Sequence, residues 1–263
     1  MNRNGRNDIL RDGEAEGTFL LLHGFAGAPE SWTTTLPGIG TGAAVRAPAL
    51  PGHHNGPPAP MSGLPFAHPV DEMSERIGPA PAGGFRLVGY SMGARVALAL
   101  LLRRPGAFRS ALLIGVHPGI GSDGERRERE RWEERWATLL EEEGIEAFVN
   151  AWERLPLFAT QERLPEETRK AQRLVRLRQH PDSLAAAMRA LGLSRMPDFR
   201  PGLAGVAAPI LFVAGDEDPR FVRLGKEAAA IAPRGRFLAV PGCGHNTPLE
   251  RPDETARLIR SLY

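Results

Sequence analysis

The sequence predicts an α/β fold with a mostly parallel central sheet, helices on both faces of the sheet and an inserted helical cap. Continuous apolar runs such as Thr18–Leu22 alternate with helical segments up to about residue 115. Strands that helices cover on both faces consist of such runs, and they belong to parallel sheets. The alternation stops near residue 120, where only charged helical segments follow, and it resumes at Pro209–Gly215.

Length and composition are those of a globular protein with a sizeable core. The chain has 263 residues, of which 42% are hydrophobic and 24% charged. It lacks a signal-peptide pattern and an apolar run near the ~18 residues that span a bilayer, so we expect a cytoplasmic protein with no membrane partner. Acidic residues are interleaved with the arginines, so we expect no nucleic-acid partner. Cys243 is the only cysteine, which excludes an intrachain disulfide and a cysteine metal site.

The first part of the chain predicts strands that alternate with helices. Residues 1–16 are polar and predict a frayed end or one short edge strand. Thr18–Leu22 predicts a buried strand that ends in the glycine-containing turn His23–Gly27. The further elements expected here are a short helix at Pro29–Trp32, a strand at Ala43–Ala49, a Pro- and Gly-rich loop at Pro51–Pro58, a helix at Val70–Ile77, a strand at Phe85–Gly89, a helix at Ser91–Leu102 and a strand at Ala111–Gly115.

The second part predicts an insertion followed by the rest of the sheet. The charged segments predict helices at Glu125–Glu142, Ile145–Arg154, Glu166–Arg178 and Ser183–Leu193. Beyond them we expect a strand at Pro209–Gly215, a helix at Phe221–Ala232, a strand at Arg236–Val240 and a helix at Thr255–Leu262. We therefore predict a core formed by residues 1–118 and 204–263, with residues 119–203 as a helical cap.

Gly89-Tyr90-Ser91-Met92-Gly93 joins a predicted strand to a predicted helix. It matches the pattern G-x-S-x-G, in which the serine occupies a strained turn and exposes its hydroxyl at the edge of the sheet. Ser91 is therefore the first candidate for chemistry. Glycine and serine are common, so the pattern alone also fits an ordinary turn with an incidental serine, and its partners elsewhere in the chain decide.

A serine hydroxyl needs an imidazole that accepts its proton, and the imidazole needs a carboxylate that holds its tautomer. Asp216 and Asp218 follow one predicted strand, and His245 follows the next. Both positions are carboxyl ends of strands, where open parallel sheets bind ligands. The order serine, acid, histidine is that of α/β-hydrolases, so we predict the α/β-hydrolase fold. We predict Asp218 as the acid, with Asp216 as the alternative that caps the following turn.

An oxyanion hole in this fold uses backbone N–H groups after the nucleophile and after the early strand. In this chain these are the amides of Met92 and Phe25. Cys243 has no basic residue positioned to activate it, so we expect it to pack as a small residue. We expect no metal ion and no cofactor.

Several runs from about residue 20 to the C-terminus carry a more specific resemblance. They are Leu22–Gly27 with Glu30-Ser31-Trp32, Gly89–Arg95, His117-Pro118-Gly119-Ile120, Glu125-Arg126-x-x-Arg129, Trp152-x-x-x-Pro156-Leu157-Phe158-Ala159, Leu177-Arg178 and Gly244-His245-Asn246. The sequence resembles the 2-succinyl-6-hydroxy-2,4-cyclohexadiene-1-carboxylate synthases of menaquinone biosynthesis, which are lyases with the α/β-hydrolase fold. It departs from their pattern at Ala94, where the family usually has a second glycine.

The resemblance implies that a proton beside a ketone is removed and that pyruvate leaves from an enolpyruvyl side chain, without an acyl-enzyme. The implied substrate, 2-succinyl-5-enolpyruvyl-6-hydroxy-3-cyclohexene-1-carboxylate, carries three carboxylates, so its site needs several fixed cations. The residues implied to bind it are Arg95, Arg129, Arg178, Tyr90, Trp152 and Phe158. The amides of Phe25 and Met92 would stabilise the enolate that develops.

Two other functions stay open at this point. A carboxylester or thioester hydrolase would use the same three residues and form an acyl-enzyme on Ser91. A neutral, apolar cap pocket would favour it, and the cap arginines argue against it. A non-catalytic binding protein of this fold usually lacks a member of the triad, and here none is missing.

Overall fold

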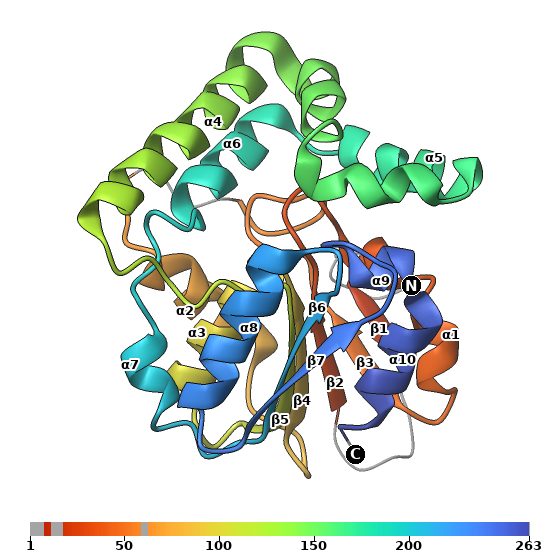
Figure 1. Cartoon of the computed structure of the whole chain (residues 1–263), viewed down its shortest axis with the longest axis vertical. Helices are drawn as coiled ribbons and strands as arrows, with labels where there is room; N and C mark the ends of the chain where they lie inside the picture. Colours follow the sequence, from red (N-terminus) through yellow and green to blue (C-terminus); the bar gives the residue numbers. More distant parts are fainter. Residues whose placement is uncertain (1–7, 12–17, 59–62, 263) are drawn as a thin grey trace.

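A computed structural model, which describes residues 8–11, 18–58 and 63–262, shows one sheet with helices on both sides (Figure 1). Within these residues the sheet has the strand order β1-β3-β2-β4-β5-β6-β7. The strands are β1 (Ile9–Arg11), β2 (Thr18–Leu22), β3 (Ala44–Ala47), β4 (Phe85–Tyr90), β5 (Phe108–Ile114), β6 (Ile210–Gly215) and β7 (Gly235–Val240). Among the strands described, only the edge strand β1 pairs antiparallel, with β3. The mostly parallel sheet is therefore confirmed. Residues 1–7 and 12–16 of the N-terminal segment, for which a frayed end is one expectation, lie outside the described residues.

The central strands β2, β4, β5 and β6 are largely buried on both faces because each face contacts its own set of helices (Figure 1). The helices on one face are α2 (Ala67–Ile77), α3 (Met92–Arg103) and α8 (Pro219–Ile231), and those on the other are α1 (Leu36–Ile39) and α10 (Pro252–Arg260). Alternate residues of a strand point to opposite faces. Accordingly, Leu20 and Leu22 pack into the apolar cluster on the face covered by α2, α3 and α8. Phe19 and Leu21 pack into the smaller apolar cluster on the face covered by α1 and α10.

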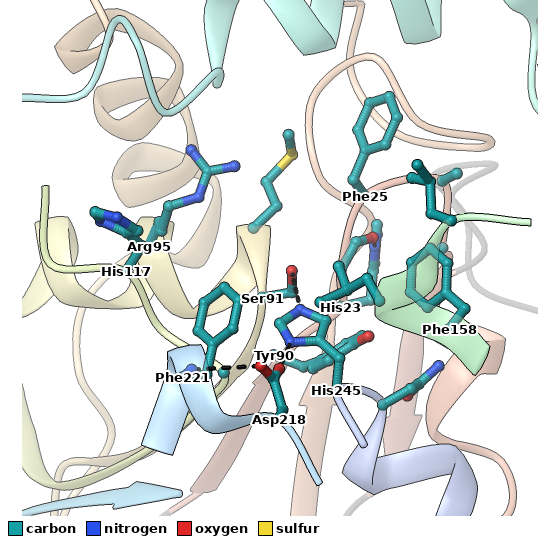
Figure 2. Close-up of a pocket in the computed structure, with 18 of the residues that line it drawn as sticks. His23, Phe25, Tyr90, Ser91, Arg95, His117, Phe158, Asp218, Phe221 and His245 are labelled. Carbon is teal, nitrogen blue, oxygen red and sulfur yellow. Dashed lines mark hydrogen bonds and ion pairs between the residues drawn. The ribbon is translucent and has the colours of Figure 1, made fainter. Parts of the chain in front are cut away.

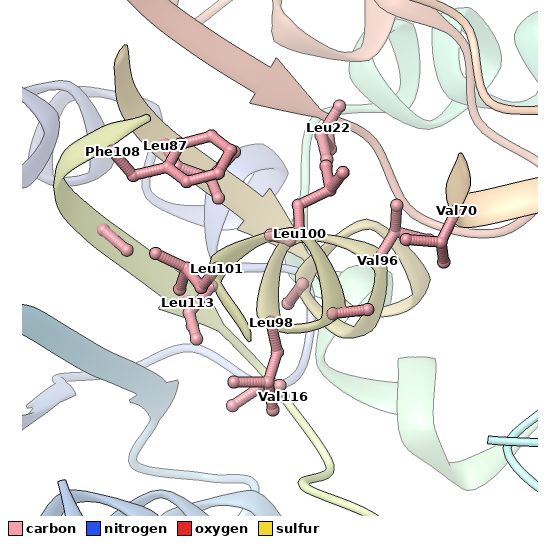
Figure 3. Packing of buried hydrophobic residues seen from close by; sticks show 14 of the residues in the cluster. Leu22, Val70, Leu87, Val96, Leu98, Leu100, Leu101, Phe108, Leu113 and Val116 are labelled. Atoms are coloured by element: carbon pink, nitrogen blue, oxygen red, sulfur yellow. The ribbon is translucent and has the colours of Figure 1, made fainter. Parts of the chain in front are cut away.

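Helix α3 is the central element of the larger apolar cluster. All of its residues from Met92 to Leu101 are buried. Figure 3 shows Leu100 of this helix near Leu22 of β2, Val96 beside Val70 of α2, and Leu98 beside Val116, which follows β5. Arg95 is the one charged residue in this stretch, and a helix that is otherwise apolar on every side is typical of a buried helix. The residue at its N-terminus is therefore held in place by the core of the protein.

Between β5 and β6 the chain forms a separate layer over the sheet, which we call the cap (Figure 1). It consists of α4 (Asp123–Trp152), the 3-10 helix η2 (Pro156–Arg163), α5 (Glu166–Leu177) and α6 (Pro181–Ala190). Gly144 interrupts α4 with φ of 80°, so the two helices predicted on either side of it are the two parts of α4. The remaining short helices are η1 (Pro29–Trp32), α7 (Arg200–Leu203) and α9 (Thr247–Glu250). In the part of the chain described, none of the helices has the length and apolar character needed to cross a bilayer.

Candidate active site

Ser91 lies in the sharp turn between β4 and α3. Its backbone has φ of 53° and ψ of −111°, a left-handed conformation that is uncommon for a residue with a side chain. The two glycines of the pentad allow the close approach that this turn requires. A Cβ atom at Gly93 would lie 2.2 Å from the carbonyl oxygen of Leu22, and one at Gly89 would lie 2.6 Å from Cα of Ala94.

We expect the substitution Gly93→Ala to lower the free energy of unfolding by about 2–3 kcal/mol, because the added methyl group overlaps backbone atoms that cannot move independently of β2. Urea unfolding measures this change. Gly106→Ala is the matched control, since a Cβ atom there meets no atom within 4 Å. Equal stabilities of the two variants would contradict the packing argument.

Ser91, His245 and Asp218 form one chain of hydrogen bonds (Figure 2). His245 Nε2 lies 3.0 Å from Ser91 Oγ, and His245 Nδ1 lies 2.8 Å from Asp218 Oδ2. A carboxylate accepts the Nδ1 proton, which leaves the Nε2 lone pair for the serine proton. The other carboxylate oxygen of Asp218 accepts from the amide of Phe221 and so fixes the carboxylate at the start of α8.

Asp216, the alternative acid, does not reach this chain. It is exposed and accepts a hydrogen bond from the amide of Gly242 at 2.8 Å. Cys243 is buried, and burial raises the pKa of its thiol to about 11, which disfavours a nucleophilic thiolate. The described residues contain no group of three or more His, Cys, Asp or Glu side chains that could hold a metal ion.

Phe25 and Met92 line the same cavity as Ser91, and Met92 directly follows Ser91 in the chain. Met92 is the first residue of α3, so its N–H has no acceptor within the helix. The structure records no acceptor for the N–H of Phe25 within the residues it describes. Both groups are therefore free to donate to an oxygen atom that carries developing negative charge.

Two buried histidines hold the loop that carries Phe25. His23 Nε2 accepts from the amide of Leu50 at 3.0 Å, and His53 Nε2 accepts from the amide of Ala26 at 3.2 Å. In each ring Nδ1 faces a carbonyl oxygen, to which only an N–H can donate. Burial lowers the pKa of His23 to about 3 and that of His53 to about 4, so both rings are neutral at pH 7.

A cavity of about 1160 Å³ lies between the cap and the serine turn. The predicted substrate-binding residues that line it are Tyr90, Arg95, Arg129, Trp152 and Phe158. Burial raises the pKa of Tyr90, so its phenol remains a neutral hydrogen-bonding group. Trp152 and Phe158 belong to an aromatic cluster of the cap, and the Phe25 ring lies 5.4 Å from that of Trp152.

Arg178 does not line the cavity, which corrects the prediction from sequence. It is exposed at the end of α5, whereas Arg176 is buried and lines the cavity. Residues two apart on a helix do not share a face, so only one of them can point inward. The helical segment was predicted, but its rotation about its own axis was not.

Three arginines of the cavity, Arg95, Arg129 and Arg176, are held by fixed partners. Arg95 donates to the carbonyl oxygen of Leu191 at 2.7 Å, and burial lowers its pKa to about 10, so it keeps its charge at pH 7. Arg129 Nε lies 2.7 Å from Glu133 Oε1, and Arg176 Nη1 lies 2.8 Å from Glu153 Oε1. A guanidinium has five N–H groups, so each arginine retains donors for an anionic ligand.

Gln179, just beyond α5, connects the cap to the loop around Phe25. Its side-chain nitrogen donates to the carbonyl oxygen of Gly27 at 3.0 Å, and its side-chain oxygen accepts from the amide of His54 at 2.8 Å. The sequence analysis assigned no role to Gln179 or His53. Both act through contacts with residues distant in sequence, for which the sequence carries no local signal.

Known proteins share the fold and family of this chain. Residues 19–258 match the model of the alpha/beta hydrolase family. A Bacillus subtilis (strain 168) protein provisionally named 2-succinyl-6-hydroxy-2,4-cyclohexadiene-1-carboxylate synthase is 30% identical over 93% of this chain and 89% of its own length. The protein of that name from Salmonella agona (strain SL483) is 28% identical over 92% of this chain and 94% of its own.

Solved structures of other proteins have the same fold. The structure of MenH from S. aureus superposes with a TM-score of 0.87 at 29% identity, over 97% of both chains. A thermophilic esterase from Thermogutta terrifontis superposes with a TM-score of 0.80 at 22% identity, over 97% of this chain and 92% of its own. At that identity the second similarity concerns the fold alone.

Proposed function

The chain belongs to the alpha/beta hydrolase family and, within it, to the 2-succinyl-6-hydroxy-2,4-cyclohexadiene-1-carboxylate synthases, and from this we propose that it is a carbon–oxygen lyase of menaquinone biosynthesis. It converts 2-succinyl-5-enolpyruvyl-6-hydroxy-3-cyclohexene-1-carboxylate to 2-succinyl-6-hydroxy-2,4-cyclohexadiene-1-carboxylate and pyruvate. The observation that carries the proposal is one cavity that joins Ser91 to the guanidinium groups of Arg95, Arg129 and Arg176. The substrate is a small polycarboxylate, and we place this biosynthetic step in the cytoplasm.

The proton-handling residues act on the carbon that bears the succinyl ketone. His245 takes the proton of Ser91 Oγ, and the serine oxygen removes the proton from C2 of the ring. The electron pair forms an enolate, whose oxygen accepts from the amides of Phe25 and Met92. As the enolate collapses, the C2–C3 double bond forms, the C3–C4 double bond shifts to C4–C5, and the bond from C5 to oxygen breaks. Pyruvate leaves as its enol form, and the proton taken from C2 balances its charge.

The arginines orient the substrate and balance its charge. Three carboxylates in one cavity repel each other unless fixed cations face them, and a guanidinium binds a carboxylate through two parallel hydrogen bonds. Arg129 and Arg176 come from the cap, and Arg95 comes from the helix that follows Ser91. A hydrolase of neutral esters needs no such set of cations, so the esterase reaction is the less favoured alternative.

This mechanism predicts that no covalent intermediate forms on Ser91. During turnover we expect one pyruvate to be released for each diene formed, and the mass of the intact protein to stay unchanged. Absorbance measures the diene, and a coupled assay measures pyruvate. A simple carboxylester should give no burst of released alcohol. A mass increase on Ser91 during turnover of the enolpyruvyl substrate would establish an acyl-enzyme and favour the hydrolase.

A further inference from the structure

His117 follows β5 and has no part in the proposed chemistry. Its side chain is buried, with 8% of the residue exposed, and it lines the same cavity as Ser91. Figure 2 shows its ring on the side of the cavity where Arg95 lies. Buried polar groups are normally hydrogen-bonded, so each ring nitrogen of a buried histidine is expected to have a partner.

The backbone fixes which nitrogen of His117 carries the proton. The amide of Gly119 donates to His117 Nδ1 at 3.2 Å, so Nδ1 is the acceptor and the ring proton resides on Nε2. Within the described residues Nε2 has no partner, and it is not sealed away from the cavity. Burial, together with the charges of Arg220, Arg95, Arg200 and Arg129, lowers the pKa of His117 to about 3, so the ring is a neutral donor at pH 7.

Arg220, in the first turn of α8, lines the cavity as well. The structure gives its guanidinium no hydrogen-bond or ion-pair partner among residues 8–11, 18–58 and 63–262. Two other arginines that line the cavity already have partners: Arg223 pairs with Glu227, and Arg200 pairs with Asp198 and donates to the carbonyl oxygen of Gly119. Arg220 and His117 therefore present unused donors, one charged and one neutral, to the same cavity.

We propose that His117 and Arg220 bind one carboxylate of the substrate, at a subsite distinct from the contacts made by the cap arginines. The proposal rests on the proposed function, in which the ligand carries three carboxylates. A carboxylate is an acceptor-only group and complements these two groups, which both donate. A neutral Nε2–H also adds a hydrogen bond without adding a positive charge to a wall that already holds several arginines.

Two substitutions of His117 separate its ligand contact from its structural contact. His117→Asn keeps an acceptor for the amide of Gly119 and removes the outer donor, whereas His117→Gln places an amide N–H₂ near the position of Nε2. We expect His117→Asn to raise KM for the enolpyruvyl substrate about tenfold with kcat within about twofold, and His117→Gln to recover most of the loss. Arg220→Ala should raise KM by about three- to tenfold, because its charge is partly screened by solvent.

Lys226→Ala is the matched control. Lys226 lies on the same helix as Arg220 and contacts Phe237 outside the cavity, and its removal changes the net charge by the same unit. Urea unfolding of each variant identifies loss of the fold. The proposal is overturned if the Asn and Gln variants have the same KM, or if Arg220→Ala behaves like Lys226→Ala.

Binding of propane-1,2,3-tricarboxylate, measured by calorimetry against glutarate, tests the subsite without turnover. We expect the tricarboxylate to bind more tightly than glutarate to the wild type, and His117→Asn to remove most of that difference. If the wild type releases no pyruvate but this binding difference is lost in the variant, the proposed function is wrong and the subsite stands. If pyruvate is released and binding is unchanged in the variant, the function stands and the subsite is wrong.

Discussion

Ser91→Ala, Asp218→Asn and His245→Ala are each expected to reduce kcat for pyruvate release by about 10²- to 10⁴-fold, the usual contribution of positioned acid–base groups. The three side chains form one hydrogen-bonded chain, so removal of any member interrupts the same proton transfer. For the same reason the losses are not additive, and a double variant should be about as slow as the slower single variant. Steady-state pyruvate release measures the rates, and circular dichroism checks the fold.

Asp216→Asn is the control for Asp218→Asn. Asp216 lies two residues earlier but accepts only from the amide of Gly242, and the oxygen of an asparagine side chain can accept the same bond. Its kcat should stay within about twofold of wild type. Activity near wild type for His245→Ala would remove the triad assignment and leave the hydrogen-bonded chain as a structural feature.

Arg95→Ala, Arg129→Ala and Arg176→Ala are expected to reduce kcat/KM by about ten- to a hundredfold each, since a lost charge-assisted hydrogen bond costs about 1.5–3 kcal/mol. Lysine should restore only part of the loss, because it keeps the charge and lacks the planar fork. A higher ionic strength should reduce the loss of kcat/KM in Arg129→Ala more than the loss in Arg176→Ala. The side chain of Arg129 is 26% exposed and is therefore screened by salt, whereas Arg176 is more deeply buried.

Arg178→Ala is the sharpest control for this series. Arg178 is exposed two residues beyond Arg176, so its replacement removes the same charge from the same helix end without touching the cavity. The exposed residues Arg127 and Arg131 of α4 give two further controls. If Arg176→Ala is no slower than these variants, the carboxylate-binding argument is wrong and the ester hydrolase becomes the better interpretation.

The sequence predicts what depends on local pattern. The run Thr18–Leu22 identifies a strand buried on both faces, and the pentad around Ser91 identifies the turn, because each needs only neighbouring residues. The positions of Asp218 and His245 follow from the rule that strand ends meet at one edge of a parallel sheet. The short helices α7 and α9 were not predicted, since four residues carry too little periodicity.

What the sequence does not predict depends on the packing of one element against another. The choice between Arg176 and Arg178 is set by the rotation of α5 against the core. His53 contacts the amide of Ala26 across 27 residues, and Gln179 contacts Gly27 across 152 residues. Such contacts exist only after the fold has formed, so the spacing of residues in the sequence does not predict them.

The contacts of Gln179 and Phe25 limit how the substrate specificity of such a protein can change through its cap. The glutamine amide satisfies backbone groups of two loops of the sheet layer, and the Phe25 ring packs among cap aromatics, so the cap supplies part of the wall that positions the Phe25 amide. A cap transplanted from another member of the fold would leave the carbonyl of Gly27 and the amide of His54 without these partners. A change of substrate through the cap is therefore expected to need matching changes in the loop at residues 23–27.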